Sequence, residues 1–157
     1  MSKTDFETAR IAMVDCQIRP ADVTHYNIIE TMLKVPREEF FPEKLRELAY
    51  AGDTLQIAPD RYSLDPRIVA KMLNLLNITD SELVLDIGGA YGYGACLISY
   101  FAQAIVLTEE LIFAKEAERI LAEQSIDNVI VCSGNLADGA SKFGLYDAII
   151  IEGGIEY

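Results

Sequence analysis

The fold is decided by one stretch near the middle of the chain, which reads Leu83-Val84-Leu85-Asp86-Ile87-Gly88-Gly89-Ala90-Tyr91-Gly92-Tyr93-Gly94. Its first five residues form a short, largely apolar run, which is typical of a buried parallel strand. The glycines that follow predict a tight turn, and the sequence from Tyr93 to Phe101 then favours a helix. A strand that passes through a glycine-rich turn into a helix indicates one unit of an α/β sheet.

The alternation of strands and helices continues beyond this stretch. Further elements are expected as strands at Ala104–Leu107, Val129–Cys132 and Ala148–Ile151, and as a helix at Ile112–Gln124. Strands that alternate with helices predict a parallel sheet with right-handed crossovers. The sequence therefore predicts an α/β fold with a Rossmann-like sheet.

The first half of the chain carries a different pattern, because its apolar residues recur at helical spacing. This spacing predicts helices at Phe6–Ile18, His25–Lys34, Glu43–Leu48 and Asp65–Leu76. Residues 53–64 contain Pro and Asp and predict a loop with short extended pieces. We therefore divide the chain into a helical segment, residues 1–78, and the first half of the Rossmann-like domain, residues 79–157, within one structural domain.

The composition limits the classes of partner. The formal net charge is -12, and hydrophobic residues make up 51% of the chain. Nucleic acids and anionic membrane surfaces are polyanions and would repel such a protein. No apolar run approaches the roughly 20 residues that a membrane-spanning helix needs. We therefore expect a globular protein that has neither a nucleic-acid nor a membrane partner.

Cysteine and histidine are too few and too scattered for a metal site. The three cysteines are Cys16, Cys96 and Cys132, no CxxC pair exists, and His25 is the single histidine. This pattern argues against zinc and against a disulfide framework, so we expect no metal site. Unpaired cysteines are typical of a reducing compartment, and we expect a cytoplasmic protein.

Three turns that follow predicted strands carry the candidate binding residues. The glycine-rich turn lets backbone N–H groups approach a ligand closely beside a helix. Roughly 20 residues further on, the second strand ends at Glu109, where a carboxylate can accept hydrogen bonds from two ribose hydroxyls. The third strand ends at Ser133–Leu136, where Asn135 can face the exocyclic amine of a base and Leu136 its ring. Ligands of open α/β sheets bind at these strand ends, so the pattern favours a nucleotide.

The class of nucleotide stays open on this reasoning alone. A glycine-rich turn can also serve only to pack a helix against a strand. Asp86 stands just before the first glycine, where it could accept a hydrogen bond from an ammonium group. A carboxylate there would repel the pyrophosphate of a dinucleotide. Asp86 therefore favours a cofactor that carries an amino-acid group.

Several segments resemble those of one family, the protein-L-isoaspartate O-methyltransferases, which are class I methyltransferases. The matching segments are Met13–Arg19, Val35–Pro42, Pro66–Leu73, Val84–Gly88 and Tyr146–Ile151. The N-terminal segments make the resemblance specific, because generic methyltransferases lack them. The match runs from about Ile11 to the end of the sequence.

The resemblance implies a fold, a cofactor and a reaction. The cofactor would be S-adenosyl-L-methionine. The substrate would be the carboxylate of isoaspartyl residues in damaged proteins or peptides. Methylation of that carboxylate would be a step in the repair of the damaged protein. Such a carboxylate is already ionised at neutral pH, so the reaction needs positioning rather than a base. The resemblance assigns cofactor binding to Asp86, Gly88, Ala90, Gly92, Glu109, Asn135 and Leu136.

The sequence departs from the family at three places. The family serine that lies near the substrate carboxylate matches Leu64, and Ser63, our candidate catalytic residue, stands one position early. The neighbouring Asp65 would repel a carboxylate substrate unless it turns away. Ala90 replaces the middle glycine of the turn, which would cost about 1 kcal/mol if φ is positive there. Asn135 replaces an acidic residue, a mild change because an amide can still bond to adenine.

These departures leave alternatives open. One is a catalytically weakened or inactive relative that binds the cofactor or a protein partner, and a weaker one is a nicotinamide-dependent oxidoreductase. The family's sheet also has more strands than the four that we find, so we expect the C-terminal strands to be missing from this sequence. We therefore expect Ile149, Ile150 and Ile151 on an exposed edge, and either a fragment of a longer protein or a homodimer formed through that edge.

Overall fold

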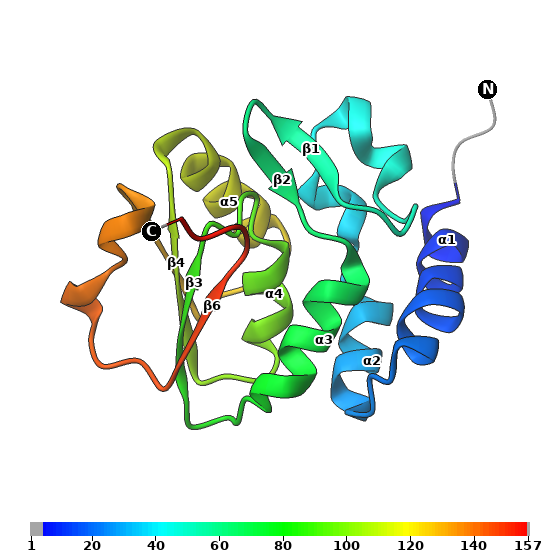
Figure 1. Ribbon diagram of the computed structural model, residues 1–157, viewed down its shortest axis with the longest axis horizontal. Helices are drawn as coiled ribbons and strands as arrows, with labels where there is room; N and C mark the ends of the chain where they lie inside the picture. The colour runs from blue at the N-terminus through cyan, green and yellow to red at the C-terminus, as the bar shows by residue number, and fades with distance from the viewer. Residues whose placement is uncertain (1–4, 157) are drawn as a thin grey trace. The chain divides into compact units, whose positions relative to one another are not determined.

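The chain forms two compact units, Met1–Leu75 and Leu76–Tyr157. The computed structural model describes residues 5–156 and is drawn in Figure 1. The first unit is mainly helical with a small hairpin, and the second contains the parallel sheet. Within the described residues, no helix is both long and apolar enough to cross a membrane.

The N-terminal unit begins with a helix that changes its winding. Helix α1 (Phe6–Met13) starts where the Asp5 side chain accepts a hydrogen bond from the Thr8 amide at 3.0 Å, and it continues as a π-helical turn over Val14–Ile18. The predicted helix over these residues is therefore present, but its last part is not α-helical. Pro20 and a left-handed Asp22 then end it.

Short elements fill the rest of this unit. Helix α2 spans Tyr26–Lys34, 3₁₀ helices span Arg37–Phe40 and Glu43–Leu48, and helix α3 spans Pro66–Leu76. Strands β1 (Leu55–Ala58) and β2 (Arg61–Ser63) pair antiparallel, with Leu55 opposite Ser63. The short extended pieces that we expected between residues 53 and 64 thus form a hairpin, whose turn contains Asp60 at φ +56°.

The C-terminal unit is the predicted α/β sheet. Its elements in chain order are β3 (Leu83–Ile87), α4 (Tyr93–Ser99), β4 (Ala104–Glu109), α5 (Leu111–Glu123), β5 (Val129–Ser133) and β6 (Ala148–Ile151). The strand order is β5-β4-β3-β6, and every pairing is parallel. Figure 1 shows α4 and α5 on one side of this sheet and the segment 136–146 on the other. The fold therefore confirms the prediction of a Rossmann-like sheet.

Both faces of the central strands are covered, which explains their continuous apolar sequence. On one face, Leu85 and Val106 pack with Ala140 from the segment after β5. On the other face, Leu107 lies beside α5 and the glycine turn. Asp86 also points to this second face, because side chains alternate along a strand.

Strand β6 is an edge of the described sheet, since its one neighbour there is β3. Ile149 and Ile151 are 53% and 37% exposed, as expected, but Ile150 is only 2% exposed. The expectation of an exposed Ile150 was wrong because alternate residues of the strand face opposite sides, and Ile150 faces the packed one.

Candidate functional site

The three turns named from the sequence meet at the carboxyl end of the sheet. The Gly88 amide donates to the Thr108 carbonyl at 3.0 Å, and the Gly134 amide donates to the Glu109 carbonyl at 3.0 Å. On the other side of β3, the Glu152 amide donates to the Ile87 carbonyl at 3.0 Å. These backbone bonds continue the strand pairing into the turns, so residues distant in sequence converge on one edge.

The glycine turn has the backbone that its sequence predicted. Gly88 and Gly92 have φ values of +74° and +93°, and Ala90 has a φ of +50°. The left-handed region suits glycine and strains a residue that carries a Cβ atom. Ala90 therefore holds a strained conformation, as its replacement of a glycine implied.

Glu109 ties the end of β4 to this turn. Its Oε2 accepts a hydrogen bond from the Ala90 amide at 2.7 Å, and its Oε1 accepts one from the Glu110 amide at 2.8 Å. The side chain is fully buried. Each carboxylate oxygen has two lone pairs, so an oxygen that accepts from an amide can also accept from a hydroxyl group. This arrangement fits the predicted role at a ribose.

The environment of Asp86 disfavours its ionised form. It is fully buried, and burial, followed by the neighbouring Glu152 and then Glu109, raises the pKa of its carboxyl well above the usual range. A Cβ atom on Gly89 would lie 2.6 Å from the Asp86 Oδ2 atom, so the carboxylate occupies the space that a side chain would need. A Cβ atom on Gly94 would collide with the Glu152 carboxylate in the same way. A side chain at Gly89 in the turn, or at Gly94 in the first turn of α4, would therefore force one of these carboxylates to move.

Glu152 was not among the site residues predicted from the sequence. The available signal was an acidic residue directly after the fourth predicted strand, at the same sheet end as Asp86 and Glu109. Because β3 and β6 are neighbours with Ile87 opposite Ile151, the two strands end side by side.

A cavity of about 590 Å³ opens beside the turns that follow β4 and β5. It is lined by Glu110, Leu111, Ile112, Phe113, Ser133, Gly134 and Asn135. Asn135 is exposed there, and the Leu136 Cδ1 atom lies 3.7 Å from the position of a Cβ atom on Gly88. Asn135 thus lines a space large enough for a base, and Leu136 lies beside the glycine turn.

Ser63 lies in the N-terminal unit, at the end of β2. Arg37 is only 1% exposed there, and its guanidinium donates to the Ala49 carbonyl at 2.8 Å, to the Leu64 carbonyl at 2.9 Å and to the Ser63 Oγ at 3.5 Å. The same cation therefore joins the segment before the hairpin to the residue that follows β2, and it lies beside the candidate hydroxyl. Sequence reasoning did not single out Arg37.

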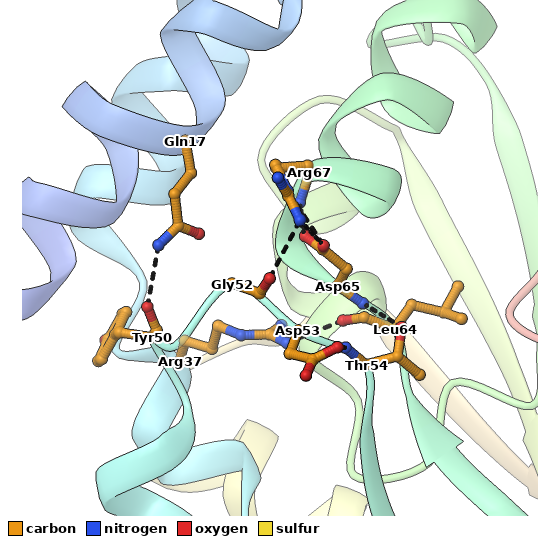
Figure 2. A network of polar contacts seen from close by, with 9 residues as sticks. All are labelled: Gln17, Arg37, Tyr50, Gly52, Asp53, Thr54, Leu64, Asp65 and Arg67. Atoms are coloured by element: carbon orange, nitrogen blue, oxygen red, sulfur yellow. Dashed lines mark hydrogen bonds and ion pairs between the residues drawn. The ribbon is translucent and has the colours of Figure 1, made fainter.

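Asp65 does not present an uncompensated charge. Figure 2 shows its side chain against Arg67, whose Nη2 lies 2.5 Å from the Asp65 Oδ2 and 3.1 Å from the Gly52 carbonyl oxygen. Hydrogen bonds from Arg67 lower the pKa of Asp65, with burial opposing them. The Asp65 amide also donates to the Thr54 Oγ1 at 3.2 Å. The expected repulsion of a carboxylate substrate is thus reduced by an ion pair.

The cysteines are free thiols. Cys96 is buried in α4, and burial raises the pKa of its thiol to about 12. A thiol with such a pKa is inert, so Cys96 serves to pack the core.

Comparison with known proteins places this geometry in a family. The model of the protein-L-isoaspartate(D-aspartate) O-methyltransferase family matches residues 9–156. Protein-L-isoaspartate O-methyltransferase 1 of Rhodopseudomonas palustris (strain HaA2) is 35% identical over 152 residues, which cover 96% of this chain and 62% of that protein. The corresponding enzyme of Gloeobacter violaceus is 37% identical over 141 residues, which cover 88% of this chain and 68% of that protein.

A solved structure agrees with the sequence relatives. A protein-L-isoaspartate O-methyltransferase superposes with a TM-score of 0.79 at 25% identity, over 90% of this chain and 47% of that chain. The present chain thus spans about half the length of that solved relative and roughly two thirds of the curated ones. The chain belongs to the protein-L-isoaspartate(D-aspartate) O-methyltransferase family.

Proposed function

We propose that this chain carries the cofactor-binding part of an S-adenosylmethionine-dependent protein carboxyl methyltransferase. Its reaction is methyl transfer to the carboxylate of L-isoaspartyl residues in damaged proteins. The observation that carries the proposal is the family match over residues 9–156, joined to a glycine turn that is bonded to Glu109 at the sheet edge. The same family match extends through the N-terminal segments, which argues against a dinucleotide-dependent oxidoreductase.

The residues at the sheet edge fit this cofactor. The backbone of Gly88, Ala90 and Gly92 approaches the ligand, and Glu109 accepts hydrogen bonds from its ribose. Asn135, which lines the cavity beside β5, faces its base, and Leu136, which lies beside Gly88, packs against the ring. Asp86 is buried, and no described backbone amide or cationic side chain donates to its oxygens, so it can receive the ammonium group.

The methyl transfer requires the protein mainly to position the two reactants. When bound, S-adenosylmethionine supplies a methyl group on a sulfonium, which is an activated donor. The isoaspartyl carboxylate is ionised at neutral pH, so no side chain has to remove a proton from it. The protein therefore has to align the two reactants and exclude water.

Ser63 is proposed to contact the substrate. The support is the resemblance of its segment to the family's serine motif and the Arg37 guanidinium 3.5 Å from its hydroxyl. An arginine that donates to Ser63 leaves the hydroxyl hydrogen available to a substrate carboxylate. Because Leu64 stands at the family position of this serine, a second candidate is a relative that binds the cofactor without repairing isoaspartate.

An assay with paired peptides tests the proposal. Full-length protein is incubated with radiolabelled S-adenosylmethionine and either an isoaspartyl peptide or its aspartyl twin. We expect a methyl ester on the isoaspartyl peptide alone, and loss of that product in Glu109→Ala. Cofactor binding without transfer to either peptide would support the second candidate, and absence of both binding and transfer would refute the proposal.

The proposed partners and cellular location follow from the proposed reaction, the net charge and the free cysteines. Isoaspartyl proteins or peptides are the substrates, and the net charge of -12 argues against nucleic acid and anionic membranes. An exposed free thiol at Cys16 suits the reducing cytoplasm.

A further inference from the structure

A half-exposed guanidinium lies close to the segment that carries the candidate hydroxyl. Arg67 stands in the first turn of α3, shortly after Ser63, and its side chain is 49% exposed. Its Nε and Nη2 atoms donate to the Asp65 carboxylate, and Nη2 also donates to the Gly52 carbonyl at 3.1 Å (Figure 2). These bonds engage three of the five N–H groups of an arginine and hold the guanidinium in one orientation.

The two N–H groups on the Nη1 atom of Arg67 are not engaged. Within residues 5–156, every hydrogen bond of this side chain comes from Nε or Nη2. Because the side chain is half exposed, a ligand from solution can reach Nη1. Hydrogen bonds from a guanidinium to a carboxylate are among the strongest in proteins, so this amino group suits an anionic ligand.

Arg67 and Ser63 contact the same short stretch of chain, residues 52–55. Three contacts join this stretch to residues 63–67: Gly52 with Arg67, Thr54 with Asp65, and Leu55 with Ser63. The unengaged donors of Arg67 therefore belong to the segment that the resemblance assigns to the substrate carboxylate. Leu64 stands at the family position of the serine in that segment, and its apolar side chain offers no donor.

The charges around Arg67 balance one another. Hydrogen bonds from Arg67 lower the pKa of Asp65, and the charge of the buried Arg37 adds to this effect. Hydrogen bonding to Asp65 raises the pKa of Arg67, and the charge of the exposed Asp53 adds to it. Two cations thus face two carboxylates. An anionic ligand therefore meets no excess of negative charge at this place, although the whole chain has a formal net charge of -12.

We propose that Arg67 is a substrate-binding residue, whose Nη1 group donates to the isoaspartyl carboxylate in place of the hydroxyl that Leu64 lacks. This inference rests on the proposed function. Asp65 positions the guanidinium for this contact, because it holds Nε and Nη2 and leaves Nη1 to the substrate. Arg67 is then a determinant of specificity, since a neutral carboxamide in the same position would accept weaker hydrogen bonds than a carboxylate.

Binding of two labelled peptides to the full-length protein, followed by fluorescence anisotropy, tests this assignment. One peptide carries an L-isoaspartyl residue, and its twin carries a carboxamide in place of the free carboxylate. S-Adenosylhomocysteine is present, so that no methyl transfer takes place. The parent should bind the isoaspartyl peptide about tenfold or more tightly than the twin, because the amide lacks the charge-assisted bonds. Arg67→Gln should lose this preference and bind both peptides alike.

Two further variants separate recognition of the carboxylate from a general effect of charge. Lys71→Gln is the matched control, since Lys71 is an exposed cation of the same helix, and this variant should keep the preference of the parent. Arg67→Lys keeps the positive charge without the planar fork, so it should retain part of the preference.

A preference that persists unchanged in Arg67→Gln would overturn the inference. Equal weakening of both peptides in that variant would also overturn it, because such a result indicates that Arg67 only holds the fold together. In either case, methylation of the isoaspartyl peptide by the parent would leave the proposed function standing. Failure of the folded parent both to bind and to methylate that peptide would overturn the proposed function together with the inference.

Discussion

The methyl group of Ala90 strains the backbone of the glycine-rich turn. Its backbone has a φ of +50°, between glycines at +74° and +93°. The hydrogen bond from its amide to Glu109 holds this conformation in place at 2.7 Å. Strain at a binding turn persists only where surrounding contacts enforce it.

The substitution Ala90→Gly should raise the free energy of unfolding by about 1 kcal/mol, because it removes a Cβ atom from a left-handed residue. It should not weaken binding of S-adenosylhomocysteine. Ala95→Gly is the control, since Ala95 lies buried in α4, and there glycine should lower stability by about 1 kcal/mol or more. Urea unfolding measures both changes, and a loss of stability in Ala90→Gly would contradict the strain.

Asp86 makes stability depend on pH in an unusual direction. Its pKa is raised in the fold by burial and by Glu152, so the protonated form stabilises the fold. That contribution is complete below the unfolded pKa of about 4 and is lost as pH rises through the folded pKa. Asp86→Asn removes this titration while keeping the shape. The stability of the variant relative to the parent should therefore increase from pH 4 to pH 9, and thermal melts across that range measure it. A difference that does not change with pH would refute the account.

At the scale of elements, the start of α3 is fixed by side chains. The Asp65 Oδ1 accepts a hydrogen bond from the Arg67 amide at 2.8 Å, and the Asp65 carbonyl accepts from the Ile68 and Val69 amides. Arg67 then joins this cap to the Gly52 carbonyl. The segment before β1 and the first turn of α3 are therefore held as one piece (Figure 2).

Asp65→Ala should lower the free energy of unfolding by about 1 kcal/mol at pH 7, since it removes the cap of the helix. Arg67 lowers the pKa of Asp65, so the stabilisation is present above the unfolded pKa of about 4 and is lost as pH falls through the folded pKa. The difference from the parent should shrink in acid. Asp65→Asn keeps a capping oxygen, so its free energy of unfolding at pH 7 should fall by less than that of Asp65→Ala. Chemical unfolding at pH 7 and pH 3 tests this, and an equal loss at both values would contradict it.

At the scale of the whole chain, strand β6 presents an apolar edge. Ile149 and Ile151 are 53% and 37% exposed there. We predict that the chain associates through this edge, and that the double substitution Ile149→Lys and Ile151→Lys reduces association through charge repulsion. Leu75→Lys, at an apolar residue of α3 that is 83% exposed, should have no such effect. Light scattering over a concentration series compares them, and equal association of all three proteins would refute the prediction.

The sequence predicted those features that depend on local pattern. The strands and helices of the sheet lie within a few residues of their predicted bounds, because apolar runs and glycine punctuation are local signals. The approach of Glu152 to Asp86 could not be predicted in this way, since it depends on β3 and β6 pairing across more than sixty residues. The ion pair of Asp65 was missed for a related reason: sequence spacing shows the charges but not the rotamers that join them.

The central claim is that the sheet edge binds S-adenosylmethionine through Glu109. Isothermal titration of full-length protein with S-adenosylhomocysteine, beside Glu109→Ala, tests it most directly. We predict clear saturable heat for the parent and its loss in a variant that still melts cooperatively. No heat and no thermal protection in a folded parent would contradict the claim, and binding that survives unchanged in Glu109→Ala would contradict the role of that residue.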